Sequence, residues 1–213
     1  MATAIKNSLK TLLDDFLPEF DVRITRATRI GASPERVYAS LRNADFDYWG
    51  ITRALYALRT LPSFPLAPRE TWRRFREELG RQRFTLEDML ADGFTLLGER
   101  PHEELLLGTV GRFWLARGEL RATSPQSFRE PAPPGNAKAA WNFTVGRRAD
   151  GITELRTETR VLCTDLVSKR RFRAYWSLIK PFSGLIRNEM LTAVRTAAES
   201  IQLKYGRSAI EEK

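Results

Sequence analysis

The sequence predicts an α+β protein in which an antiparallel β-sheet of about six or seven strands wraps around a long C-terminal α-helix. Two segments lead to this prediction. Residues 154–163 (ELRTETRVLC) alternate charged side chains with apolar or hydroxyl side chains, as a strand does when its two faces meet different surroundings. Residues 168–205 then place aromatic and aliphatic side chains at helical spacing, which is typical of a helix packed on a sheet.

Length and composition indicate one domain with a sizeable core. The chain has 213 residues, of which 42% are hydrophobic and 29% charged. We expect an N-terminal helix over 1–20, a single domain over 21–205 and a tail over 206–213. Cys163 is the only cysteine, which excludes an intramolecular disulfide and a multi-cysteine zinc site and favours a cytoplasmic location. We find no apolar run near the roughly 18 residues that a membrane-spanning helix needs.

The first part of the chain predicts helices around one strand. The stripe of apolar residues in 1–20 predicts an amphipathic helix that ends at Pro18 and packs on its own domain or on a second subunit. Residues 21–30 alternate as a strand, and Ser33 and Pro34 then suit the N-cap and first turn of a helix. The proline-rich residues 50–85 predict a helical insertion, either a mobile lid or a structural hairpin of helices.

Strands dominate the middle of the chain. Turn signals at 100–103 and 149–151, the second containing Asp-Gly, join neighbouring strands into hairpins. Consecutive strands with short turns form an antiparallel sheet. We expect these strands over residues 94–99, 104–115, 126–130, 138–148 and 151–164.

Side-chain alternation predicts the orientation of the last strand. Glu154, Arg156, Glu158 and Arg160 share one face, where opposite charges support one another, so we expect this face to meet water. The opposite face carries Leu155, Val161 and Cys163 together with two threonines. Threonines are unusual in a dry core and suit a pocket that admits a polar ligand or water.

The C-terminal helix must cover that inner face. Pro181 lacks a backbone N–H and Gly184 weakens the same turn, so we expect a kink or a break after Lys180. The inward stripe of this helix is predicted to comprise Phe172, Trp176, Ile179, Leu185, Ile186, Met190, Val194, Ala197 and Ile201.

The chain is strongly basic, with a net charge of +9 and a pI near 10.1. Residues 166–213 hold 10 basic and 4 acidic residues, so 10 − 4 = +6 of the excess lies there. This helix face is either simply solvated or binds an anionic membrane surface or an acidic partner. We do not expect nucleic acid as a partner, since the chain has no zinc-finger spacing, basic-region heptads or aromatic RNA-binding consensus.

The candidate binding residues lie on elements that should face one another across the sheet and the helix. Arg112 is open to two interpretations: an inward arginine that binds a carboxylate or phosphate, or an arginine on the outer sheet face. The other candidates are mostly aromatic, because ligand pockets are largely apolar with few polar anchors. The full set is Arg112, Trp114, Trp141, Phe143, Thr157, Thr159, Phe172, Tyr175, Trp176 and Ile179.

No catalytic residue can be assigned from the sequence. The single histidine, His102, falls in a polar turn, and Cys163 is expected to be a buried apolar thiol. The chain has no HExxH motif, dinucleotide fingerprint or phosphate-binding loop. We therefore expect neither a metal nor a cofactor.

Four segments resemble the helix-grip superfamily, which includes START domains, birch-pollen-allergen-like proteins and polyketide cyclase/dehydrase-like proteins. They are Gly108–Trp114 (GTVGRFW), Pro134–Lys138 (PGNAK), Thr157–Val161 (TETRV) and Tyr175–Arg187 (YWSLIKPFSGLIR). The similarity is to uncharacterised bacterial members. The resemblance implies a hydrophobic or amphipathic small molecule bound between the sheet and the helix.

Three functions follow as hypotheses. The first is binding or carrying of such a molecule. The second is a cyclase, dehydratase or hydrolase that uses an ionisable side chain in the same cavity. The third is an interaction protein that uses the basic helix face, with a homodimer as a further expectation.

Overall fold

The computed structural model describes residues 10–46, 69, 72–73, 76–77, 80, 83–115 and 119–211, with no side-chain description beyond residue 200. Its centre is a five-stranded antiparallel sheet in the order β1-β5-β4-β3-β2. The strands are β1 (Val22–Ile30), β2 (Thr95–Arg100), β3 (Glu104–Gly111), β4 (Ala137–Arg147) and β5 (Thr153–Cys163). The α+β prediction and the antiparallel sheet against a long C-terminal helix are confirmed.

The predicted number of about six or seven strands was too high. Residues 126–130, expected to form a strand, lie in the short helix α6 (Pro125–Arg129). Ser124 accepts a hydrogen bond from the Ser127 N–H, and Pro125 occupies the first turn, so local capping outweighs the strand pattern. The predicted helical insertion over residues 50–85, whether lid or structural hairpin, falls largely outside the described residues.

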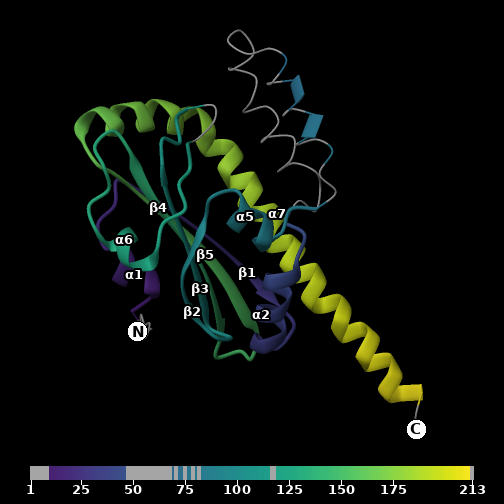
Figure 1. Cartoon of the computed structure of the whole chain (residues 1–213). Helices are drawn as coiled ribbons and strands as arrows, with labels where there is room; N and C mark the ends of the chain where they lie inside the picture. Colours follow the sequence, from purple (N-terminus) through teal and green to yellow (C-terminus); the bar gives the residue numbers. More distant parts are fainter. Residues whose placement is uncertain are drawn as a thin grey trace.

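Helices cover both faces of the sheet (Figure 1). Helices α1 (Leu12–Phe16) and α6 lie on one face, which we call the outer face. Helices α2 (Pro34–Asn43), α5 (Leu86–Ala91) and α7 (Leu166–Glu211) lie on the other, the inner face. Ser33 caps α2 as predicted, with Pro34 in the first turn. The sheet is therefore a middle layer with an apolar core on each side.

The orientation predicted for β5 is confirmed on its inner face. Leu155 packs in the large inner core with Phe143 of β4 and Val194 of α7, and Thr157 is fully buried on the same face. The register pairs Thr157 with Phe143 and Thr159 with Trp141, so the two threonines lie beside the aromatic residues of β4.

The outer face of β5 meets water only in part: Arg156 is exposed and Glu154 is partly exposed, as predicted, but the second half of this face is covered. Glu158 and Arg160 are each only 6% exposed, because α1 packs over them. The Arg160 guanidinium contacts Glu158 Oε1 at 2.8 Å and Asp14 Oδ1 at 2.6 Å. It also donates to the carbonyls of Leu13 and Leu17, which are groups at the C-terminus of α1. Glu158 and Arg160, predicted to lie at the surface, thus belong to a buried network of charges and hydrogen bonds that attaches α1 to the sheet.

Helix α7 is one continuous helix of 46 residues with Pro181 inside it. Figure 1 shows its first part running across the top of the sheet and its second part turning downward past α5 and α2. The predicted kink is confirmed, and the helix continues to Glu211, beyond the expected end at Tyr205. Leu185 was wrongly placed on the inward stripe, since it is 49% exposed.

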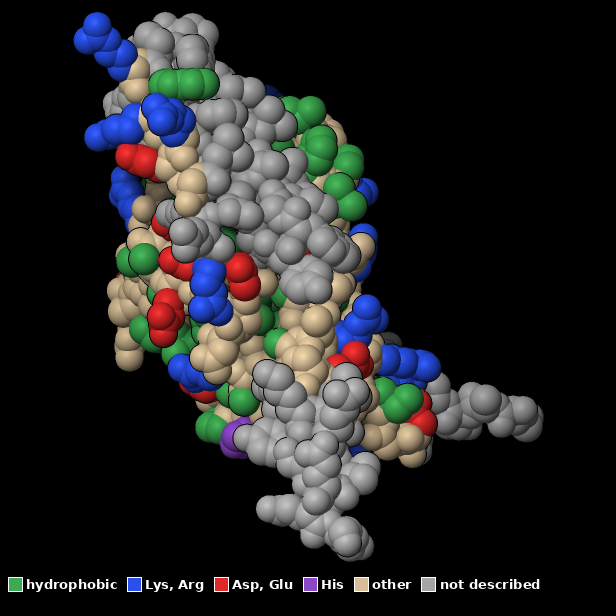
Figure 2. Space-filling view, turned by 90° about the vertical axis from the view of Figure 1, so that its right-hand side faces the viewer, with side chains coloured by type: hydrophobic (Ala, Val, Ile, Leu, Met, Phe, Trp, Pro, Cys, Tyr) green, Lys and Arg blue, Asp and Glu red, His purple; other side chains and the backbone are tan. Residues whose placement is uncertain are grey.

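The charges of the remaining surface are mixed. Lys and Arg side chains are dispersed over the described part of the face shown in Figure 2, with Asp and Glu side chains between them. Among the described helices, none is both long and apolar enough to cross a membrane.

Removing the Arg160 side chain should destabilise the fold. Arg160→Leu leaves Glu158 and the end of α1 without their buried cation, and breaking a buried pair costs about 3–5 kcal/mol. The matched control is Arg156→Leu on the same strand face, which removes a half-exposed ion pair worth about 1 kcal/mol or less. Urea unfolding at neutral pH measures both, and equal losses would contradict the role of Arg160.

Acid should weaken the same network. Burial alone would raise the pKa of Glu158, but hydrogen bonds from Arg23 and Arg160 hold that pKa below its usual value of 4.5. A folded-state pKa below the unfolded one gives stability that is present above pH 4.5 and is lost as the pH falls through the folded pKa. In unfolding titrations against pH, Glu158→Gln should therefore differ most from the wild type near neutrality and least in acid. The exposed Glu19→Gln serves as control, and a constant difference for Glu158→Gln would refute the linkage.

Candidate functional site

One arginine of α7 points into the layer between the helix and the sheet. Arg187 is 7% exposed, and its Nη2 donates to Thr159 Oγ1 at 2.8 Å. Its Nη1 donates to the Ser183 carbonyl at 2.9 Å and also contacts the Ser183 hydroxyl. The guanidinium carbon lies 5.5 Å from the ring centre of Trp141. These contacts fix a cation against the middle of the sheet.

The Trp141 ring is held by the strand next to it. Its Nε1 donates to Thr157 Oγ1 at 2.5 Å, and that hydroxyl donates in turn to the Asn142 carbonyl at 2.8 Å. Phe143 lies 5.3 Å away, centre to centre, and Phe94 of the loop before β2 packs edge-on at 6.5 Å. The indole therefore has a fixed position, and one of its faces is turned to Arg187.

The inner face keeps some contact with solvent at its centre. Ala139 and Trp141 belong to β4, the middle strand of the sheet, yet both are only partly buried. Ile186 of α7 and Leu96 of β2 are partly buried around the same core. Apolar side chains in the middle of a covered sheet normally lose all contact with water. This part of the layer is therefore accessible from outside.

An aromatic cluster borders this region under the first part of α7. Phe172 is almost fully buried and stacks on Trp176 at 5.9 Å, with Phe113 edge-on at 6.4 Å. Trp114 and Tyr175 pack against the same cluster. The Trp114 Nε1 is buried and has no hydrogen-bond acceptor among the described residues. The sheet contributes Ala137, Ala139, Val161, Val22 and Cys163 to this cluster.

The structure brings most of the predicted binding residues together in two groups. Thr159 and Trp141 contact Arg187, and Phe143 and Thr157 contact Trp141. Trp114, Phe172, Tyr175 and Trp176 form the aromatic cluster. Arg112 and Ile179 join neither group. Arg112 follows the end of β3, is 42% exposed and pairs with Glu119 at 3.6 Å, so of its two interpretations a surface position holds. Ile179 is partly buried.

Sequence reasoning missed Arg187 and Ser183. Both belong to the segment Tyr175–Arg187 that carried the resemblance, but neither was assigned to the site. Arg187 follows Phe172 by 15 residues, close to four helical turns, so helical spacing alone places it on the inward side. Glu189 of the same helix was also missed and is fully buried.

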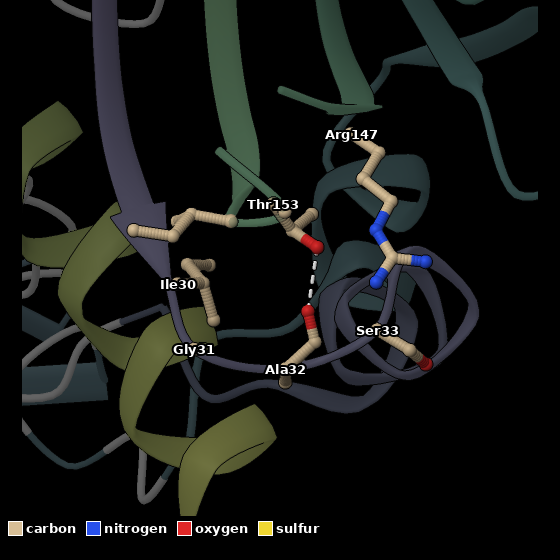
Figure 3. Close-up of a pocket in the computed structure, with 8 residues that line it drawn as sticks. Ile30, Gly31, Ala32, Ser33, Arg147 and Thr153 are labelled. Carbon is tan, nitrogen blue, oxygen red and sulfur yellow. Dashed lines mark hydrogen bonds between the residues drawn. The ribbon is translucent and has the colours of Figure 1, made fainter. Parts of the chain in front are cut away.

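A hollow lies at the other end of the inner face. It has a volume of about 280 Å³ and is lined by residues 30–33, Arg147 and residues 151–153. Figure 3 shows Arg147 extending toward Ser33, while Thr153 donates to the Ala32 carbonyl at 2.5 Å. Ser33 is occupied in capping α2. None of the predicted binding residues lines this hollow.

The reactive side chains of the chain lie away from Arg187. Burial, with the nearby charge of Asp21, raises the pKa of the Cys163 thiol to about 12, so it is protonated at neutral pH. His102 sits in the β2–β3 turn, edge-on to Tyr38 at 5.7 Å. Within the described parts of the chain, no group of three His, Cys, Asp or Glu side chains is placed to hold a metal ion.

Comparison with family models, curated proteins and solved structures finds no match to this chain. The likeness to the helix-grip superfamily thus stays a prediction from the sequence.

The Cys163 thiol should resist alkylation in the native protein. At pH 8, a pKa of about 12 in place of 9.0 lowers the thiolate fraction steeply, so iodoacetamide should react at least about 100-fold more slowly than in urea. Mass spectrometry over a time course measures both rates. Similar rates in the folded and unfolded protein would show an exposed, reactive thiol.

Proposed function

We propose that the protein binds an amphipathic small molecule with an anionic head between the sheet and α7, in the manner of a helix-grip protein. The observation that carries this proposal is Arg187, a buried guanidinium set beside a threonine hydroxyl and an indole ring on a partly accessible sheet face. The chain would hold or carry this molecule.

The surroundings of Arg187 suit a carboxylate or phosphate head. A guanidinium offers parallel N–H donors that match the oxygens of both groups, and a partly desolvated site strengthens such contacts. The hydroxyl of Thr159 can donate to an oxygen that Arg187 also binds, since a hydroxyl both donates and accepts. Arg26 of β1 adds a second cation nearby, because its Nη2 lies against Gly184, one turn before Arg187.

The neighbouring aromatic cluster suits an apolar tail. Ala137 and Ala139 present little side chain toward α7, whereas Phe172 and Trp176 are large and rigid. Ligand pockets are lined mainly by hydrophobic and aromatic side chains such as these. The two groups of residues thus support the two ends of one amphipathic molecule.

The described chemistry favours binding over catalysis. The Cys163 thiol is protonated, and His102 lies in a turn that packs on Tyr38. Among the described residues, Arg187 contacts two hydroxyls, a carbonyl and an aromatic ring, which are groups that position a ligand.

The test is a comparison of three twelve-carbon probes by isothermal titration calorimetry below their micelle concentrations. Dodecanoate and dodecyl phosphate should bind more tightly than dodecanol, which has no charge for Arg187. Arg187→Gln should lower the affinity for the two anions by about 10- to 100-fold, as expected for a lost hydrogen bond to a charged group. The affinity for dodecanol should stay unchanged. The affinity of Arg187→Lys for the anions should lie between those of the wild type and Arg187→Gln, since lysine keeps the charge but lacks the planar guanidinium with its parallel donors.

The matched control is Arg195→Gln, which removes an exposed arginine from the same helix. Because Arg187 is buried, Trp141→Phe provides a second variant that alters the site while keeping its shape. Trp141→Phe should also lower the affinity for the anions. Circular dichroism checks the folding of each variant. Equal affinities for dodecanoate and dodecanol, or an unchanged affinity in Arg187→Gln, would overturn the proposal.

A further inference from the structure

The first part of α7 exposes a continuous strip of apolar and basic side chains. Leu178 is 70% exposed and Leu185 is 49% exposed, although leucines of this helix would be expected to face the sheet. Leu166 and Val167 are exposed at its beginning. Arg170, Arg171, Arg173 and Lys180 are exposed on the same part of the helix. We call these eight residues the α7 strip.

Helical geometry places the apolar and basic residues of the strip side by side. Val167, Leu178 and Leu185 are 11 and 7 residues apart, which is close to three and two turns, so they form one row. Arg173 and Lys180 are 7 residues apart and form a second row on the other flank. Arg170 lies between the rows. The opposite side of the helix holds Phe172 and Trp176 against the sheet.

The strip carries positive charge that is not neutralised by an ion pair among the described residues. From Leu166 to Asn188 the chain contains no acidic residue. Within the described part of the chain, Arg170, Arg171, Arg173 and Lys180 form no ion pair, whereas Lys169, at the margin, pairs with Asp21. An occupant of this surface must therefore supply negative charge and also accept exposed leucine side chains.

We propose that the α7 strip docks on an anionic membrane surface. Leucines between arginines on one helix face match an interfacial helix, whose apolar side chains enter the lipid while its basic side chains meet the headgroups. The membrane supplies about 1 kcal/mol of attraction per basic residue near the surface.

Two other occupants fit less well. A second copy of the chain would bring two strips together across a two-fold axis, and neither strip has an acid to pair with the other's arginines. Protein interfaces depend on buried tryptophan, tyrosine and arginine anchors, and leucine and valine are under-represented among them. The apolar residues of this strip are leucines and a valine.

Vesicle sedimentation tests the proposal with the full chain. The vesicles are phosphatidylcholine alone, or phosphatidylcholine with one-third phosphatidylglycerol. We expect binding to the anionic vesicles only, weakening as salt is raised because of screening. Arg170→Gln, Arg173→Gln and Lys180→Gln combined should lower the partition coefficient by roughly 100-fold. Leu178→Gln with Leu185→Gln should lower it by about 10-fold, since the lipid-entering side chains are lost.

The matched control combines Arg29→Gln, Arg147→Gln and Arg195→Gln. It removes the same net charge from exposed positions outside the strip and should change binding by less than about threefold, because charges beyond a Debye length of the membrane are screened. Equal losses in the control and in the strip variant would assign binding to net charge and overturn the proposal. The proposal would also be overturned by an absence of binding at low salt, or by a dimer in sedimentation velocity that Leu178→Gln abolishes.

Membrane docking and ligand binding are separable in these experiments. The strip variants should keep the dodecanoate affinity of the wild type, because the strip side chains are exposed, whereas Arg187 is buried and is held by Ser183, Thr159 and Trp141. Arg187→Gln should still sediment with anionic vesicles. A negative result in one experiment therefore contradicts only the proposal that it tests.

Discussion

The structure depends on burying both faces of a sheet that carries charged side chains. A buried charge must be paired or hydrogen-bonded, because its desolvation is costly. On the outer face, Arg160 meets this need by joining Glu158, Asp14 and the end carbonyls of α1. On the inner face, Arg187 is fixed by Thr159 and Ser183. Each arginine thus fastens a helix to β5, and the positions of α1 and α7 follow from them.

The two arginines nevertheless have different surroundings. Arg160 lies among carboxylates and backbone carbonyls, so its pairing is complete within the fold and its role is structural. Among the described residues, Arg187 contacts the Thr159 hydroxyl, Ser183 and the Trp141 ring, beside strand residues that solvent still reaches. This difference in partners and in access is why the inner arginine, and not the outer one, is the candidate anchor for a ligand.

Local patterns predicted the elements well and their environments less well. Alternation in β5 identified the strand and its inner face, because the period of a strand is fixed by its backbone. The same alternation cannot distinguish a wet charge ladder from a buried network. That distinction depends on α1, which is distant in sequence and packs on Glu158 and Arg160. Arg112, which was open to an inward or an outer position, lies beyond the end of β3 and pairs with Glu119 at the surface.

The bend at Pro181 explains why one helix has two such different halves. Pro181 removes one intrahelical hydrogen bond. Ser183 lies two residues after Pro181, and its carbonyl accepts a hydrogen bond from the Arg187 side chain, which stabilises the turn that follows the proline. The second part of α7 can then follow the sheet and α2, where Glu199 binds the Gly31 N–H. The first part is left across the end of the sheet with only its aromatic side covered. The α7 strip, on the opposite side, is exposed as a consequence of that geometry. The bend thereby places an accessible basic surface on the helix segment that carries the aromatic cluster of the proposed binding site.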